Sequence, residues 1–225
     1  MVHLVALISF MPLPALRPQP LVRIPEPFND PAWLWELKLD GFRSLAFIEN
    51  GQCRLVSRNG HVYKRFDPLR ASPLRELKVK DAILDGEVVC LDAEGRSIFN
   101  RLLFSGGNPV FAAFDLVWIN GQDLRGVPLM KRKERLRQVV PVESPCVLHV
   151  DYLPEKGKEL FALACEQDLE GIVGKWAKGT YQDDGRSTSW VKVKNANYSQ
   201  AEGRADLFEG KSRARRTRPP ELKFA

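Results

Sequence analysis

The sequence has few residues that could hold it together through covalent or metal bonds. Its 225 residues include four cysteines and three histidines, and no two cysteines form a C-x-x-C pair. A zinc site or a disulfide framework is therefore not expected, and the chain suits a reducing cytoplasm. It has no internal repeat and no apolar run near the ~18 residues of a membrane-spanning helix. The apolar stretch 4–16 is interrupted by two prolines and preceded by no Lys or Arg, so a signal peptide is not expected.

What the sequence does contain is an ordinary globular composition with a localised excess of positive charge. Hydrophobic residues make up 44% and charged residues 28%, which excludes a wholly disordered or fibrous chain. The net charge is 34 − 28 = +6, and residues 211–218 hold five bases and no acid. This tail is either a solvated end or a phosphate-binding segment. Its bases are Lys211, Arg213, Arg215, Arg216 and Arg218.

Short strand-like runs separated by turn signals dominate the chain. Seven prolines in residues 12–31 predict an extended arm, and the Asn50-Gly51 pair predicts a tight hairpin over 44–57. Helical patterns occur at 128–140 and 157–168. Irregularly inserted helices favour an antiparallel α+β fold over a regularly alternating parallel sheet. Further strands are expected at 83–91, 110–119, 147–152, 171–176 and 188–194.

A run of alternating residues at 33–40 predicts a strand with one apolar and one polar face. Because successive side chains of a strand point to opposite faces, Glu36, Lys38 and Asp40 would share the polar one. Gly41, which permits a tight turn, and Arg43 follow. Taken alone, this pattern fits either an ordinary half-exposed strand or a charged site.

Three other segments place charged residues among apolar strand residues. Lys192 and Lys194 would project from one strand face, where two cations repel unless an anion lies between them or water solvates the edge. Asp85 and Glu87 share a face of an apolar strand, and Glu170 opens another strand after a helix. Such carboxylates need a partner, which is a base, a ribose hydroxyl or a metal. Each segment alone fits a structural ion pair as well as a binding site.

Six motifs occur together in one order, and the set is far more specific than any single member. In this order the chain resembles the adenylation domain of ATP-dependent DNA ligases, most closely the ligase module of bacterial end-joining ligases. The resemblance covers residues 20–200. The motifs are K-x-D-G-x-R at 38–43, S-R-N-G at 57–60, D-G-E at 85–87, F-A-A-F-D-L at 111–116, E-G-I-V-x-K at 170–175 and W-V-K-V-K at 190–194.

The resemblance implies a covalent nucleotidyltransferase (ATP-grasp-like) α+β domain, in which antiparallel sheets with flanking helices surround a nucleotide cleft. It divides the chain into an N-terminal extension (1–19), the adenylation domain (20–200) and the basic C-terminal tail (201–225). It also implies that ATP and Mg²⁺ are the cofactors and that nicked double-stranded DNA is the partner. The expected setting is DNA repair in the cytoplasm.

The resemblance further implies roles for the motif residues that would act on the nucleotide and the nick. Lys38 would be the nucleophile that takes AMP from ATP. A lysine amine attacks phosphorus only when it is unprotonated, so neighbouring cations would have to favour the neutral form. Arg43 would contact ribose or phosphate, and Arg58 the 5′-phosphate of the nick. Glu87 would bind the ribose hydroxyl, and Phe114 would stack on adenine.

The remaining motif residues would hold the phosphates, the metal and the base. Glu170 would help to hold Mg²⁺, and Lys192 and Lys194 would contact the α-phosphate. Glu36 matches a position that reads the adenine amine. Asp40 is assigned to the catalytic set, with its action as an orienting group, a ligand or a base left open.

The sequence departs from the family pattern after the last motif. ATP-dependent DNA ligases continue into an OB-fold of about a hundred residues, whereas 225 − 194 = 31 residues follow Lys194 here. We therefore expect sealing to depend on a separate protein that supplies an OB-fold, with the five bases of the tail adding DNA contacts. Two alternatives stay open: a non-sealing DNA-binding or regulatory module that depends on a partner, and an RNA ligase or capping-type nucleotidyltransferase.

Overall fold

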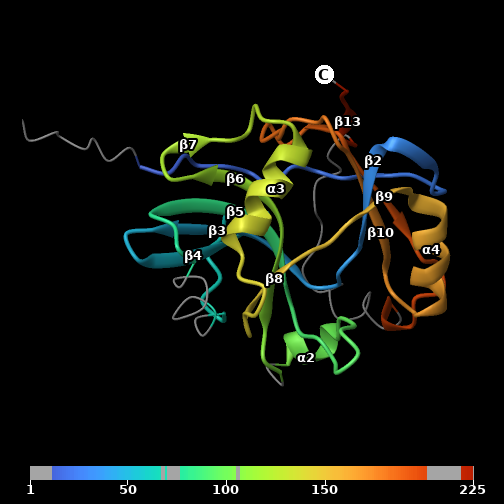
Figure 1. The fold of residues 1–225 in the computed structure, drawn as a ribbon. Helices are drawn as coiled ribbons and strands as arrows, with labels where there is room; N and C mark the ends of the chain where they lie inside the picture. Colours follow the sequence, from blue (N-terminus) through green and yellow to red (C-terminus); the bar gives the residue numbers. More distant parts are fainter. Residues whose placement is uncertain (1–11, 67–68, 70–76, 105–106, 202–218, 225) are drawn as a thin grey trace, which may run out of the picture.

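Two β-sheets form the body of the protein in the computed structural model, which describes residues 12–66, 69, 77–104, 107–201 and 219–224 (Figure 1). The first sheet has five strands in the order β1-β12-β10-β2-β9. Strand β2 pairs antiparallel with both β10 and β9, and the edge strand β1 lies parallel to β12. The bounds are β1 Val22–Arg23, β2 Asn29–Leu37, β9 Leu153–Lys156, β10 Gly171–Trp176 and β12 Trp190–Lys194.

The second sheet has the order β4-β3-β5-β6-β7, and a further strand, β8, pairs parallel with β6. All other neighbours in it are antiparallel. The expected α+β fold with mainly antiparallel sheets is therefore confirmed. The bounds are β3 Phe42–Glu49, β4 Gln52–Ser57, β5 Asp81–Val89, β6 Val110–Ile119, β7 Gln122–Asp123 and β8 Val147–His149.

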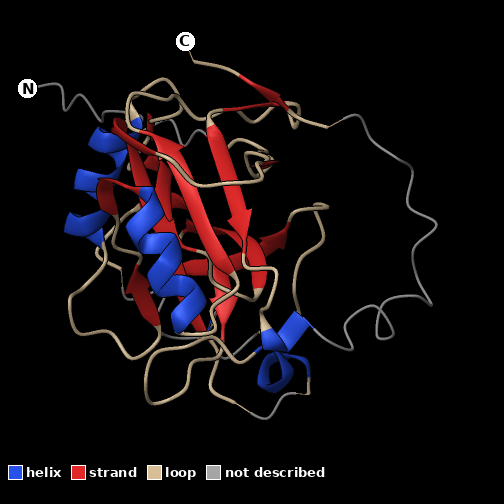
Figure 2. Ribbon diagram, turned by 90° about the vertical axis from the view of Figure 1, so that its right-hand side faces the viewer, coloured by secondary structure: helices blue, strands red, loops and turns tan. Residues whose placement is uncertain are grey.

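The helices lie on the outside of the sheets (Figures 1 and 2). Helix α3 (Leu129–Val139) packs on β6, and α4 (Gly157–Glu166) packs on β2 and β10. A short α2 (Phe99–Leu103) and a 3₁₀ turn (Ser199–Ala201) follow β5 and β12. No helix within the described ranges is long and apolar enough to cross a membrane.

The hairpin of β3 and β4 forms where the sequence predicts it. Asn50 and Gly51 have φ values of 52° and 68°, so both central residues of the turn adopt the left-handed conformation. Asn and Gly tolerate this conformation, and the resulting turn matches the twist of the strands. The register Ser44↔Ser57 to Glu49↔Gln52 follows without a bulge.

The observed strand β2 differs from the predicted strand at 33–40 at both of its ends. It begins at Asn29 and tolerates Pro31 because the pairing with β9 is irregular between Asp30 and Leu34. It ends at Leu37, so Lys38 and the two residues after it continue beyond the strand. After these residues the chain passes close against β5: a Cβ on Gly41 would lie 2.1 Å from the Val88 carbonyl oxygen. Gly41 thus serves a close approach rather than a turn that needs positive φ.

Two other predicted strands differ from the structure. The run 147–152 ends at His149 in β8. The run 188–194 is divided at Ser189 into β11 (Ser187–Thr188) and β12. The Ser189 carbonyl accepts a hydrogen bond from the Trp176 amide at 3.1 Å. Strand β11 pairs with β13 (Glu221–Leu222), which brings residues 219–224 back onto the domain.

Candidate active site

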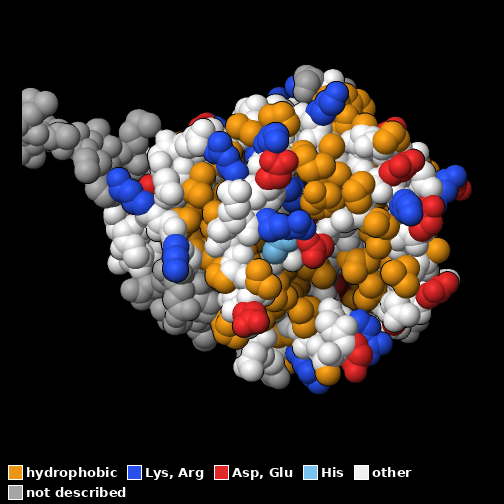
Figure 3. Space-filling view, in the orientation of Figure 1, with side chains coloured by type: hydrophobic (Ala, Val, Ile, Leu, Met, Phe, Trp, Pro, Cys, Tyr) orange, Lys and Arg blue, Asp and Glu red, His pale blue; other side chains and the backbone are white. Residues whose placement is uncertain are grey.

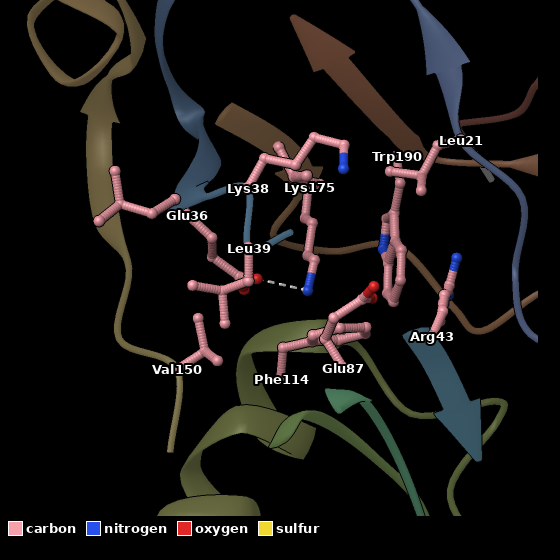
Figure 4. Close-up of a pocket in the computed structure, with 12 residues that line it drawn as sticks. Leu21, Glu36, Lys38, Leu39, Arg43, Glu87, Phe114, Val150, Lys175 and Trp190 are labelled. Carbon is pink, nitrogen blue, oxygen red and sulfur yellow. Dashed lines mark ion pairs between the residues drawn. The ribbon is translucent and has the colours of Figure 1, made fainter. Parts of the chain in front are cut away.

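A pocket between the two sheets brings together residues that lie far apart in the sequence (Figure 4). The first sheet contributes β2, β10 and β12, and the second contributes β3, β5 and β6. We call this cavity the inner pocket. Its lining includes Glu36, Lys38, Arg43, Glu87, Phe114, Lys175 and Trp190. A wider cavity, the outer cleft, adjoins it and shares Lys38, Arg43 and Glu87; its lining also includes Arg17, Arg58 and Lys192.

Lys38 stands directly after β2, and its position is fixed at both ends. Its amide donates to the Gly171 carbonyl at 2.9 Å, and its Nζ lies 2.5 Å from Oε2 of Glu170. The other carboxylate oxygen of Glu170 lies 3.0 Å from Nζ of Lys194. Glu170 is buried with 7% of its surface exposed, and it links Lys38, directly after β2, to Lys194 at the end of β12.

Two titrating groups face the same cleft from opposite sheets. Burial lowers the pKa of Lys192, and the charges of Lys38 and Lys194 lower it further. Burial raises the pKa of Glu87 to about 8, although Lys38 and Arg43 act in the opposite direction. At neutral pH the Glu87 carboxyl is therefore largely protonated and can donate a hydrogen bond.

Arg43 is held by a buried network rather than left free in the cleft. Its Nε and Nη2 donate to the two oxygens of Asp85 at 3.1 and 2.7 Å. Asp85 is fully buried and also accepts a hydrogen bond from the Tyr181 hydroxyl at 2.7 Å. The guanidinium carbon lies 5.5 Å from the centroid of the Phe114 ring and 5.3 Å from that of Trp190. Arg43 thus faces the pocket with a fixed orientation.

Glu36 forms the back of the inner pocket with two buried lysines. Its Oε2 lies 2.6 Å from Nζ of Lys175, and its Oε1 pairs with Lys133 of α3. Nζ of Lys175 is 4.1 Å from the centroid of the Phe114 ring and 4.2 Å from that of Trp190. Burial lowers the pKa of Lys175 to about 8, against the opposing effect of Glu36. In Figure 4 this ion pair lies opposite the Phe114 side chain.

Asp40, two residues after Lys38, lines a different cavity from the inner pocket. It is buried, and its carboxylate accepts a hydrogen bond from the Tyr198 hydroxyl at 2.8 Å. Asp40, Lys38 and Glu170 border a small cavity next to α4. These contacts tie the segment after β2 to the segment after β12, which fits the orienting role among those left open for Asp40.

The structure gathers most of the expected site residues at this one place. The tail bases Lys211, Arg213, Arg215, Arg216 and Arg218 lie outside the described residues. Sequence reasoning missed the groups that hold the site in shape. Lys175 stood within a motif and could have been found there, whereas no local pattern marks the roles of Lys133 and Tyr181. The gathered residues are Glu36, Lys38, Asp40, Arg43, Arg58, Glu87, Phe114, Glu170, Lys192 and Lys194.

The part of the chain that the structure describes contains no group of three or more His, Cys, Asp or Glu residues arranged to hold a metal. Mg²⁺ does not require such a cage, because it commonly binds through one or two carboxylates together with substrate phosphates and water. Glu170 supplies a carboxylate beside Lys38 and Lys194. The donor set therefore suits a magnesium ion that arrives with a nucleotide.

The sheets and the cleft together define the class of the covalent nucleotidyltransferases, which carry a nucleotide on a lysine. Within that class, the chain belongs to the family described as the ATP dependent DNA ligase domain, whose model matches residues 19–194. The resemblance inferred from the motifs is confirmed.

Individual relatives agree with this assignment. The multifunctional non-homologous end joining protein LigD of Pseudomonas aeruginosa is 38% identical over 168 residues, which are 72% of this chain and 20% of that protein. The SPbeta prophage-derived DNA ligase-like protein LigB of Bacillus subtilis is 34% identical over 193 residues, which are 82% of this chain and 69% of that protein. The structure of mycobacterial DNA ligase D complexed with ATP and MES superposes with a TM-score of 0.68 at 29% sequence identity. The match covers 80% of this chain and 60% of the mycobacterial chain. The chain thus spans a fifth of the Pseudomonas protein.

Proposed function

We propose that this domain transfers AMP from ATP to Lys38 and then to the 5′-phosphate of nicked DNA, so that the nick can be sealed. The observation that carries the proposal is the position of the Lys38 amine between the two sheets, 2.5 Å from Glu170 and beside the cations of β12. Membership of the ATP dependent DNA ligase domain family supports it. The names of the LigD and LigB relatives, which refer to end joining and to DNA ligase, support the choice of DNA.

In the first step, the Lys38 nitrogen attacks the α-phosphorus of ATP. The N–P bond forms, the bond to pyrophosphate breaks, and pyrophosphate leaves with the electron pair. Lys38 gives up two protons in total: Glu170 is close enough to accept the one that leaves before the attack, and solvent or the departing pyrophosphate takes the one released as the N–P bond forms. Lys192 and Lys194 would hold the α-phosphate oxygens, because their positive charges favour the negative charge that develops there.

The inner pocket suits the nucleoside part of ATP. The partly buried Phe114 ring offers a face for adenine, and the protonated Glu87 carboxyl can donate to a ribose hydroxyl. Arg43 would contact the ribose or phosphate from its fixed position. Glu36 is proposed to bind the adenine amine. Both carboxylate oxygens of Glu36 already pair with lysines, so adenine would join this ion cluster.

Mg²⁺ is proposed to bind with the phosphates, and Glu170 is the residue that would help to hold it. When bound, it would neutralise part of the phosphate charge and so ease attack by the lysine. Asp40 would keep the segment of Lys38 in place through Tyr198.

The DNA step is proposed to use the outer cleft. Arg58 lines this cleft and would bind the 5′-phosphate of the nick. The five tail bases and a separate protein with an OB-fold remain proposed contributors, since that fold closes over ATP and DNA in the resembled ligases. We further propose 20–200 as the adenylation domain, 201–225 as the DNA-binding tail, and a cytoplasmic location.

Replacement of Lys38 tests the proposal. The protein is incubated with labelled ATP and Mg²⁺, examined for a covalent adduct, and then offered nicked DNA. We expect Lys38→Ala to abolish the adduct, and Lys38→Arg to be equally inactive because guanidinium stays protonated. Lys156→Ala is the control and should leave the adduct intact, because Lys156 pairs with Asn29 at the start of β2 whereas Lys38 follows the end of that strand.

A labelled adduct of full intensity in folded Lys38→Ala protein would contradict the proposal. An adduct without sealing would favour the partner-dependent module. In a parallel incubation with labelled GTP, a GMP adduct in place of the AMP adduct would favour a capping-type enzyme.

A further inference from the structure

Three cations that line the outer cleft, Arg17, Arg58 and Lys192, differ from Lys38 and Arg43 of the same cleft in forming no ion pair with a described residue. Among the residues that the structure describes, none forms an ion pair with Arg17, Arg58 or Lys192. On the face shown in Figure 3, by contrast, acidic and basic side chains lie close together. One exposed pair of this kind joins Lys131 and Glu134 at 3.0 Å.

A groove continues from the outer cleft and carries further cations of this kind. Arg17 and Gly185 line both the cleft and a neighbouring cavity, which Arg186 and Lys223 also border. We call this cavity the outer groove. The side chains of Arg186 and Lys223 likewise form no ion pair with another described residue. The groove therefore extends the row of unpaired cations away from Lys38.

Two acids, Asp184 and Glu221, also line the groove, and Asp184 is already engaged by the backbone. Both the Arg186 and the Ser187 amides donate to Oδ1 of Asp184 at 2.7 Å. These hydrogen bonds lower the pKa of Asp184 to about 2, so the carboxylate is ionised and serves to shape the turn. Its side chain is thus committed to the loop that carries Arg186.

The arm that carries Arg17 is fixed by a buried residue two positions later. Gln19 is fully buried and donates from Nε2 to Oγ1 of Thr188 at 3.1 Å. Its Oε1 accepts the Gln182 amide at 2.7 Å, and the Thr188 hydroxyl donates to the Pro20 carbonyl at 2.6 Å. The arm is therefore built into the domain at this point.

The opposite wall is the segment 219–224, which is fixed just as firmly. The Glu221 amide donates to the Arg186 carbonyl at 2.8 Å, and the Lys223 amide donates to the Thr188 carbonyl at 2.7 Å. The Phe224 ring packs edge-on against Trp33 and Trp176, with centroid distances of 5.8 and 5.6 Å. Cations on such supports lose little backbone freedom when they bind a ligand.

We propose that the outer groove binds the sugar-phosphate backbone of the DNA duplex beside the nick, through Arg17, Arg186 and Lys223. This inference rests on the proposed function, because the groove opens from the cleft that would hold the nick. A row of fixed cations that form no ion pair with another described residue suits a row of phosphates. Arg17 and Lys223 lie outside residues 19–194, so the family match assigns them no role. Contacts of this kind position the duplex without reading its sequence.

The test compares two triple variants of the full chain that lose the same charge. The groove variant is Arg17→Ala, Arg186→Ala and Lys223→Ala. The control variant is Lys78→Ala, Lys156→Ala and Lys158→Ala, three exposed lysines that line neither the outer cleft nor the outer groove. Binding of a labelled, 5′-phosphorylated nicked duplex is measured over a series of salt concentrations, on two unrelated DNA sequences. Formation of the AMP adduct by the unmodified protein is measured separately.

Each lost phosphate contact reduces the slope of log affinity against log salt by about 0.9, so the groove variant should lose up to about 2.7 of slope. The control should match the unmodified protein, and both DNA sequences should give the same result. Equal salt slopes for the two variants, or no binding of the nicked duplex by the unmodified protein, would overturn the proposal that the groove binds DNA. Absence of the AMP adduct would instead overturn the proposed function, so the two ideas fail on different measurements.

Discussion

The inner pocket and the outer cleft differ in where their charges find partners. In the inner pocket, Arg43 pairs with Asp85, and Glu36 pairs with two lysines. In the outer cleft, no described residue pairs with Arg58 or Lys192. The difference indicates two uses of charge within one cavity: the paired groups hold the shape of the pocket, whereas the unpaired groups depend on a ligand for their counter-charge.

Burial explains why the two regions behave differently. A buried charge without a partner is strongly destabilising, so the inner charges must be paired before any nucleotide arrives. An exposed cation stays hydrated and contributes little to stability. Substitutions in the two regions should therefore affect different measurements, with stability and ATP affinity falling in the inner pocket and DNA binding falling in the outer cleft.

The largest effect on stability is expected from Asp85→Ala. This change leaves the buried Arg43 guanidinium and the Tyr181 hydroxyl without their carboxylate partner. Removal of one member of a buried ion pair costs about 3–5 kcal/mol, which urea denaturation would measure.

A double variant separates the ion pair from simple packing. Asp85→Leu with Arg43→Met removes both charges and should recover part of the lost stability, because no unpaired charge remains. A double variant as unstable as Asp85→Ala would show that the pair is not what makes this position sensitive.

Phe114→Ala should reduce ATP affinity next in order of size. A ring stacked on a base contributes about 1–3 kcal/mol, so calorimetric titration with ATP should show a dissociation constant about five-fold to over a hundred-fold higher. The alternative is a Phe114 that only packs against Trp190, whose ring centroid is 5.9 Å away. Unchanged ATP affinity with a large fall in melting temperature would favour that alternative.

Glu87 adds a pH dependence that the outer cations lack. Its pKa is raised from 4.5 to about 8 in the folded protein, so the folded state keeps a proton that the unfolded state has released. Stability relative to Glu87→Gln should therefore be greatest below about pH 4.5 and fall as the pH rises toward 8. The slope is at most about 1.4 kcal/mol per pH unit. Unfolding curves of both proteins at several pH values measure it, and parallel pH profiles would contradict the raised pKa.

The smallest effect on stability should come from Arg58→Ala. An exposed residue without an ion pair changes the free energy of unfolding by no more than about 0.5 kcal/mol. Loss of one phosphate contact should still reduce the salt slope of nick binding by about 0.9. A stability loss comparable with that of Asp85→Ala would erase the distinction between the two regions.

Local patterns were sufficient to predict much of the fold and many residues of the site. The hairpin of β3 and β4 follows from Asn50 and Gly51, whose conformational freedom acts within the turn itself. The six motifs locate the cleft because their spacing and order are visible in the sequence. The predicted strand at 33–40 was wrong at both ends, since the observed strand spans Asn29–Leu37 and the pairing with β9 and β10 that defines it is made by residues distant in sequence.

The groups that fix the site could not be predicted because their partners are distant in sequence. Lys175 and Glu36 are 139 positions apart, and Lys133 reaches the same carboxylate from a helix. Tyr181 and Asp85 are 96 positions apart. Nothing in the neighbourhood of these residues distinguishes a buried ion pair from a solvated charge, because only the packing of the two sheets decides it.

The strand order of the first sheet has a consequence for protein synthesis. Strand β2 has its neighbours in β10 and β9, so Leu37 must wait for Ile172, which is 172 − 37 = 135 residues later. At about 5–20 residues per second, the ribosome needs about 7 to 27 seconds for that interval. During this time the apolar side of β2, with Trp33 and Trp35, lacks its partner strands and is open to chaperones. The lysine that would carry the nucleotide is thus made early, but its binding site is completed only when Lys194 has been made, 194 − 38 = 156 residues later.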